Sequence, residues 1–157
     1  MPVRPSIPTL LLALLLTPAA LAQPTPAAPA TPTPNLVSLW LLDAENGRPI
    51  PNLKPLIYSE SGGKSLPINP VGDLYTIDIT AHTSLTLGDI TDATPAATNF
   101  SPCYLPNNLA FDIKQIQSTG IAPQNKCSKR THAAAPGELV IFLRKTHWWE
   151  LWQKNIN

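Results

Sequence analysis

Two apolar runs stand out from an otherwise mixed pattern of hydrophobic and polar positions. Leu36 to Leu42 (LVSLWLL) is too short to span a membrane and is followed by a turn signal at Asn46-Gly47. Glu138 to Arg144 (ELVIFLR) is the second such run. Runs of this length are typical of strands buried on both faces, so each is predicted to be a core strand. We expect the two to be partners in one sheet or in facing layers.

Shorter strands are predicted between these two runs. Lys54 to Glu60 and the short piece Leu66 to Ile68 are candidates, each closed by a cluster of turn residues. Leu74 to Ile79 alternates cleanly, with Tyr75, Ile77 and Ile79 on one side, and Ser84 to Ile90 repeats the alternation. Short strands divided by Gly and Pro turns favour a mainly β fold, an antiparallel β-sandwich of about seven strands.

One short helix is predicted over residues 113–119. Asp112 can cap the free backbone amides, and Gln115 three positions later completes a capping box. Gly120 suits a left-handed closing residue, and Ile121 beyond it predicts a Schellman-type end. Residues 122–137 are predicted to be a loop that leads into the last strand.

The beginning of the chain has the composition of an export signal. Residues 1–22 combine a basic start at Arg4, an apolar region over Leu10 to Leu16, and a small-x-small site at Ala20 to Ala22. They are predicted to be a signal peptide cut after Ala22; an uncleaved anchor is the alternative. Residues 23–35 are predicted to be a linker, because QPTPAAPATPTP lacks charge and large apolar residues and favours polyproline II structure.

Charge and cysteine count refine this picture. Loss of residues 1–22 would remove one basic residue from 11 and none of the 10 acidic ones, leaving a neutral mature chain. Neutrality and the lack of a basic patch argue against a nucleic-acid partner. The two cysteines, Cys103 and Cys127, are predicted to form a disulfide in an exported protein, with two free buried thiols as the alternative.

The sequence predicts no catalytic or metal-binding site. His82, His132 and His147 are far apart in the sequence and belong to no zinc-protease motif. No nucleophile elbow is present, and Gly62-Gly63-Lys64 suits a hairpin turn better than a phosphate loop. The expectation is therefore a protein that is not an enzyme and uses no metal or cofactor. Asn99 begins a formal glycosylation sequon, which matters only in a eukaryotic secretory pathway.

The first half of the folded region carries a family pattern. Asp43, Gly47, Pro49 and Ile50, followed later by Gly72-Asp73-Leu74-Tyr75, resemble the carboxypeptidase regulatory-like, transthyretin-like β-sandwich. The resemblance covers about residues 36–90 and implies a fold rather than an activity. In the enzymes that give the family its name, this module accompanies a separate catalytic zinc domain. The rest of the chain resembles small exported bacterial proteins that carry such a domain.

The end of the chain is rich in tryptophan. The β-sandwich is predicted to span residues 36–144 and to be followed by a tail, residues 145–157. Read as a helix, this tail places Trp148, Trp149 and Trp152 on one broad face. The tryptophans could cover an open end of the sandwich or form an interaction surface, since tryptophan is enriched at binding hot spots and at membrane boundaries.

These expectations lead to three functional hypotheses. The first is an exported, non-enzymatic binding or structural module, secreted or located in the periplasm or cell envelope, with an unknown protein or envelope component as partner. The alternative is a peripheral envelope or membrane protein, not transmembrane, that is anchored through its tryptophan-rich tail. The third, a diverged enzyme, lacks any nameable set of nucleophile, base or metal ligands.

Overall fold

The structure is a computed structural model, and it describes residues 35–60, 63–94, 98–104, 109–147 and 150. Its elements follow one another along the chain as β1 (Leu36–Asp43), β2 (Leu53–Ser59), β3 (Ile68–Val71), β4 (Leu74–Asp78), β5 (Ser84–Asp92), β6 (Asn99–Pro102), β7 (Ala110–Asp112), α1 (Ile113–Thr119) and β8 (Glu138–Lys145). The predicted signal peptide (residues 1–22), all of the predicted linker except Asn35, and most of the tail lie outside the described residues.

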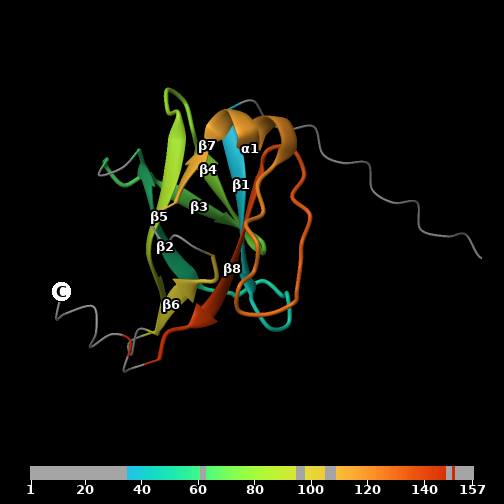
Figure 1. Cartoon of the computed structure of the whole chain (residues 1–157). Helices are drawn as coiled ribbons and strands as arrows, with labels where there is room; N and C mark the ends of the chain where they lie inside the picture. Colours follow the sequence, from blue (N-terminus) through green and yellow to red (C-terminus); the bar gives the residue numbers. More distant parts are fainter. Residues whose placement is uncertain (1–34, 61–62, 95–97, 105–108, 148–149, 151–157) are drawn as a thin grey trace, which may run out of the picture.

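The strands form one sheet that curls until it is nearly barrel-shaped, with the short helix packed at one end (Figure 1). Their order is β2-β5-β6-β8-β1-β4-β3, and β7 pairs with β5 beside this path. The predicted fold class, mainly β with one short helix, is confirmed. One detail differs, because β1 and β8 run parallel while every other ladder between the named strands is antiparallel. Parallel neighbours need a long crossover, which the chain between β1 and β8 supplies.

The two apolar runs lie at the centre of the sheet, as the hydrophobic pattern predicts. β1 and β8 are neighbours, with Ser38 opposite Glu138 and Asp43 opposite Leu143. Leu139, Val140, Ile141, Phe142 and Leu143 are all at most 3% exposed, so β8 is buried on both faces. The half-exposed strand β4 also behaves as predicted: Tyr75 and Ile77 point into the core, and Asp78 is exposed.

Burial on both faces requires two apolar layers. The larger layer fills the barrel and includes Leu39, Ile77, Leu85 and Ile141. The smaller layer lies on the outer face of β1 and β8, where the loop of residues 122–137 covers it; its buried members are Leu42, Ala44, Cys103, Val140 and Phe142. This covered outer face explains why the two central strands lack the alternation seen in β4 and β5.

Helix α1 is capped by Asp112 as predicted, and it ends differently. The Asp112 carboxylate accepts hydrogen bonds from the backbone N–H of Lys114 (2.7 Å) and Gln115 (3.3 Å). Gly120 has the expected positive φ (73°), yet its ψ of 164° is extended, so the predicted Schellman-type end is wrong. The N–H of Ile121 bonds instead to the carbonyl of Glu138 (2.9 Å), because the chain pairs with β8 directly after the helix.

Three strands differ from the prediction. β6 and β7 were missed, since four and three residues are too few to establish a periodic pattern. β3 spans Ile68–Val71, whereas the predicted strand was Leu66 to Ile68 with a turn after it. The dipeptide Asn69-Pro70 is typical of turns, but an edge strand also tolerates proline on its free side.

Candidate functional site

The two end strands of the sheet, β2 and β3, face each other across an open seam. At one end of the seam the chain before β3 closes it: Tyr58 and Ser65 form an isolated bridge, and the N–H of Leu66 donates to the carbonyl of Ile57 (2.7 Å). Farther along, no ladder joins β2 to β3. A groove with a volume of about 550 Å³ occupies this region, and we call it the seam groove.

The wall of the seam groove comes mainly from two segments distant in sequence, and Tyr75 and Ala93 complete it. Residues 49–56 contribute β2 and the chain leading to it, while Ile68, Pro70 and the Gly72-Asp73 turn contribute the β3 side. Four prolines are among the lining residues: Pro49, Pro51, Pro55 and Pro70. The lining is therefore mainly apolar, and it is poor in backbone N–H donors because proline has none.

The turn after β1 directs the chain toward the seam groove. The Asp43 carboxylate accepts hydrogen bonds from the N–H of Glu45 (2.9 Å) and Asn46 (3.0 Å), and Gly47 supplies the positive φ (72°) that the turn requires. The N–H of Ile50 then donates to the carbonyl of Leu41 (3.0 Å), which pins the returning chain against β1. The motif residues Asp43, Gly47 and Ile50 thus build the approach to β2.

Tyr75 provides a polar group in this apolar setting. Its side chain is 7% exposed, and its hydroxyl donates a hydrogen bond to the carbonyl of Leu53 (2.9 Å), which links β4 to β2 across the seam. Burial raises the pKa of the Tyr75 phenol above its usual value. The hydroxyl is therefore neutral at physiological pH, and its oxygen still has lone pairs that can accept a hydrogen bond.

Exposed side chains surround this buried centre. Leu56 belongs to the groove lining and is 44% exposed, which is high for a leucine beside a cavity. Lys54 and Asp73 are the charged residues of the lining, and both are exposed to solvent. Val71 is 55% exposed and is not among the residues that line the groove.

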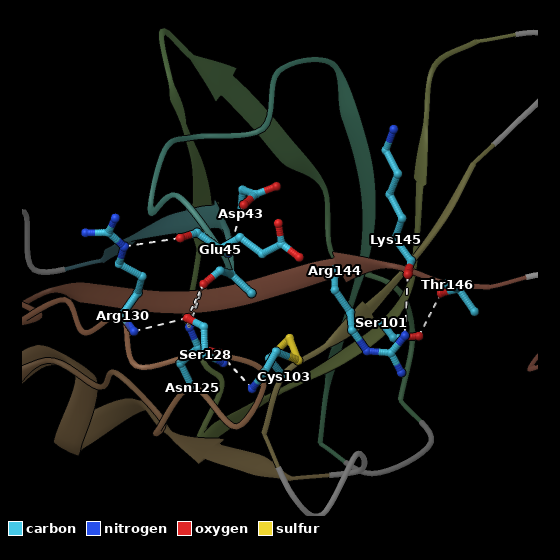
Figure 2. Close-up of a disulfide and its surroundings, with 12 residues drawn as sticks. Asp43, Glu45, Ser101, Cys103, Asn125, Ser128, Arg130, Arg144, Lys145 and Thr146 are labelled. Carbon is cyan, nitrogen blue, oxygen red and sulfur yellow. Dashed lines mark hydrogen bonds between the residues drawn. A yellow bond between two sulfur atoms is a disulfide. The ribbon is translucent and has the colours of Figure 1, made fainter.

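On the opposite side of the barrel, a disulfide holds a loop against the outer face of the sheet. Cys103 and Cys127 form the predicted disulfide, with their Cα atoms 5.5 Å apart, and it ties the loop of residues 122–137 to the chain following β6 (Figure 2). The Asn125 amide donates to the carbonyl of Ala44 (3.0 Å), and its oxygen accepts from the N–H of Cys127 (3.0 Å). Arg130 Nε adds a bond to the carbonyl of Glu45 (3.1 Å).

The histidines do not come together in the structure. His82 lies in the turn after β4, the His132 ring lies 6.4 Å from that of Trp40, and His147 follows β8. Within the part of the chain that the structure describes, no three His, Cys, Asp or Glu side chains are arranged as metal ligands would be.

The predicted interaction residues Trp148, Trp149 and Trp152 lie outside the described residues. The start of the tail is described and is anchored: Arg144 and Glu150 form an ion pair (2.8 Å), and the Glu150 carboxylate also accepts from the N–H of His147 (3.2 Å). The hydrogen bond from Arg144 lowers the pKa of Glu150, which keeps this carboxylate ionised.

Sequence reasoning missed the seam groove. Its signal was present in Pro55 and Pro70, which lie within strands where proline marks a free edge. A proline within a strand favours an edge position, although Pro102 at the end of β6 lies inside the sheet. The sequence alone does not show, however, that these two edges face each other, because that follows from the complete strand order.

Comparisons with known proteins give no relative of this chain. No family model matches it, and neither a protein of curated function nor a solved structure is significantly similar. Among the described residues, no helix is both long enough and apolar enough to cross a bilayer.

Proposed function

We propose that this protein is an exported, non-enzymatic binding module of the cell envelope or extracellular space, and that its ligand occupies the seam groove. One observation carries the proposal: the barrel is left open between β2 and β3, and an apolar groove of about 550 Å³ fills the opening. Ligand sites in proteins are usually concave, mainly apolar and about 300–1,000 Å³ in volume, with a few polar groups that orient the ligand.

Export is supported by the disulfide. Disulfides persist in oxidising compartments and are rare in the cytosol, so the Cys103–Cys127 bond is compatible with a periplasmic or extracellular location. The proposal includes cleavage after Ala22 and a linker over residues 23–35. It also includes membership of the carboxypeptidase regulatory-like family, for which the turn built by Asp43 and Gly47 and the mainly β fold are the support.

The test is a comparison of two exposed apolar residues. The mature chain (residues 23–157) and its Leu56→Glu and Val71→Glu variants are immobilised and exposed to an envelope extract. Leu56→Glu puts a charge into the groove lining, whereas Val71→Glu makes the same change in a neighbouring exposed residue that does not line it. Material retained by the wild type and by Val71→Glu but lost with Leu56→Glu supports the proposal. Equal retention by both variants contradicts it.

A second candidate function is attachment to the envelope through the tryptophan-rich tail. The ion pair between Arg144 and Glu150 favours it, because it anchors the described start of the tail to the end of β8. Deletion of residues 146–157 distinguishes between tryptophans that attach the protein to the envelope and tryptophans that cover an open end of the fold. Unchanged thermal stability with lost envelope association supports attachment, while a large loss of stability shows that the tail completes the fold.

A further inference from the structure

We propose that the seam groove takes a compact, uncharged, largely apolar small molecule carrying one hydrogen-bonding group, and that it does not take a peptide added as an extra strand. This inference rests on the proposed function and specifies its ligand. A gap between two free strand edges is at first sight the ideal place for strand addition, since each edge presents unpaired backbone groups. The chemistry of the two edges here argues against that mode.

The β2 edge lacks a donor at its centre. The carbonyls of Leu53 and Ile57 both point to the seam, since one accepts from Tyr75 and the other from Leu66. Because backbone direction alternates along a strand, Pro55, midway between these two residues, also turns its backbone to the seam. Its nitrogen carries no hydrogen, so an added strand would find no donor there.

The β3 edge also lacks a backbone N–H donor where it faces the seam. Val71 and Leu74 flank the two-residue turn Gly72-Asp73, in which Gly72 has a positive φ of 60°. The pair that flanks such a turn exchanges hydrogen bonds, so the next pair, Pro70 and Tyr75, is a non-hydrogen-bonded one. The nitrogen of Pro70 therefore faces the seam rather than β4, and the second edge also lacks its donor.

Without these donors an incoming peptide strand would bury carbonyl groups that have no partner, and unpartnered buried polar groups destabilise a complex. An apolar molecule has no such requirement. The proline rings of the lining, with Ile50, Leu53 and Ile68, offer it a hydrocarbon surface in a cavity of small-molecule size. The two edge prolines thus exclude one class of ligand while building the wall for another.

The polar residues of the lining indicate the remaining chemistry of the ligand. The Tyr75 hydroxyl already donates to Leu53, so it is available to a ligand as an acceptor and favours one N–H or O–H group. The other polar lining residues, Asn52, Lys54 and Asp73, are exposed to solvent, so none of them is a buried polar partner and neither charge offers a buried counter-charge to an ionised ligand. A charge brought into the groove would be desolvated without compensation, and an uncharged ligand avoids that cost.

Fluorescence titration of the mature chain with N-phenyl-1-naphthylamine tests the inference. This probe is neutral and apolar, carries one N–H group, and becomes strongly fluorescent when it leaves water. We expect saturable binding with one probe per chain. Leu56→Glu is expected to weaken binding about tenfold through lost apolar contact. Tyr75→Phe is expected to weaken it about threefold to tenfold through the lost acceptor, and Val71→Glu should change it less than about twofold.

Thermal melting of each variant shows that it is folded before its binding is compared. Absence of saturable binding to the folded wild type, or equal weakening by Leu56→Glu and Val71→Glu, overturns the inference. If the probe fails to bind while an envelope polypeptide is still retained in a Leu56-dependent manner, the ligand class is wrong and the proposed function stands. If groove-dependent retention and probe binding both fail, the proposed function fails as well.

Discussion

The two sides of this barrel differ in how they are covered and cross-linked. On the β1–β8 side, the loop of residues 122–137 lies over the outer face of the sheet and is held there by the Cys103–Cys127 bond and by Asn125. On the seam side, β2 and β3 end the sheet, the chain before β3 closes only one end of the gap among the described residues, and prolines limit the pairing of both edges. Side-chain burial and cross-linking are thus concentrated on one side, while the other offers an open apolar cavity. Mutations on the two sides should consequently have different effects.

The largest expected effect is on the closed side. Ile141 is fully buried in β8, so Ile141→Asp places an unpaired carboxylate in the core. The cost is several kcal/mol against a total stability of about 5–15 kcal/mol, and we expect loss of cooperative folding. Thermal unfolding followed by circular dichroism measures it. Leu56→Asp, at an exposed seam position, is the control and should melt near the wild-type temperature. A wild-type melting temperature for Ile141→Asp would show that the core assignment is wrong.

Removal of the disulfide should have the next largest effect. The double variant Cys103→Ala, Cys127→Ala frees the covering loop, and chain entropy for this loop length predicts a loss of about 3 kcal/mol in the free energy of unfolding. Urea denaturation of exported protein gives the value. Reduction of the wild type should cause the same loss. If the double variant is less stable than the oxidised wild type by under about 0.5 kcal/mol, the role assigned to the bond is contradicted.

A smaller loss is expected from Asn125→Ala. This side chain is 7% exposed, and it joins the covering loop to the carbonyl of Ala44 and caps the N–H of Cys127. Its removal leaves the N–H of Cys127 without this partner, whereas the Ala44 carbonyl still accepts from the Ser128 hydroxyl, so we expect a loss of about 1–3 kcal/mol. The matched control is Asn69→Ala on the exposed β3 edge, which should be nearly neutral. Equal urea midpoints for the two variants would show that Asn125 does not help to hold the loop in place.

The smallest effect appears only at high pH. Burial raises the pKa of Tyr104, the residue after Cys103, from 10 to about 12. A raised pKa in the folded state means that stability is complete below the unfolded value and is lost as pH rises from about 10 to 12. Spectrophotometric titration should show a late phenol step that disappears in Tyr104→Phe. A midpoint near pH 10 for Tyr104 would indicate that its ring is open to solvent.

Local patterns in the sequence predicted the parts of the fold that repeat or that carry caps. The two apolar runs, the alternation around Tyr75 and the Asp112 cap each have a signal within a few residues, and the structure contains all three. The end of α1 was misjudged because Ile121 bonds to Glu138, a partner 17 residues away that no local pattern reveals.

The seam groove could not be predicted from the sequence for a related reason. Pro55 and Pro70 each mark a free edge, but their mutual position depends on the order of all the strands between them. The disulfide could be proposed from the cysteine count and the export signal, whereas its function as the tie of a covering loop required the layer on the outer face of β8.

The parallel pairing of β1 with β8 has a consequence for the time at which the protein can fold. The first strand meets the last, with Ser38 opposite Glu138, and β8 is the only named strand that joins the β2-β5-β6 half of the sheet to the β1-β4-β3 half. Until the ribosome has made β8, the chain holds two half-sheets without their shared centre. Such long-range closure is slow. For the export proposed above this delay would be an advantage, because the central strand is the last of the named strands to be synthesised.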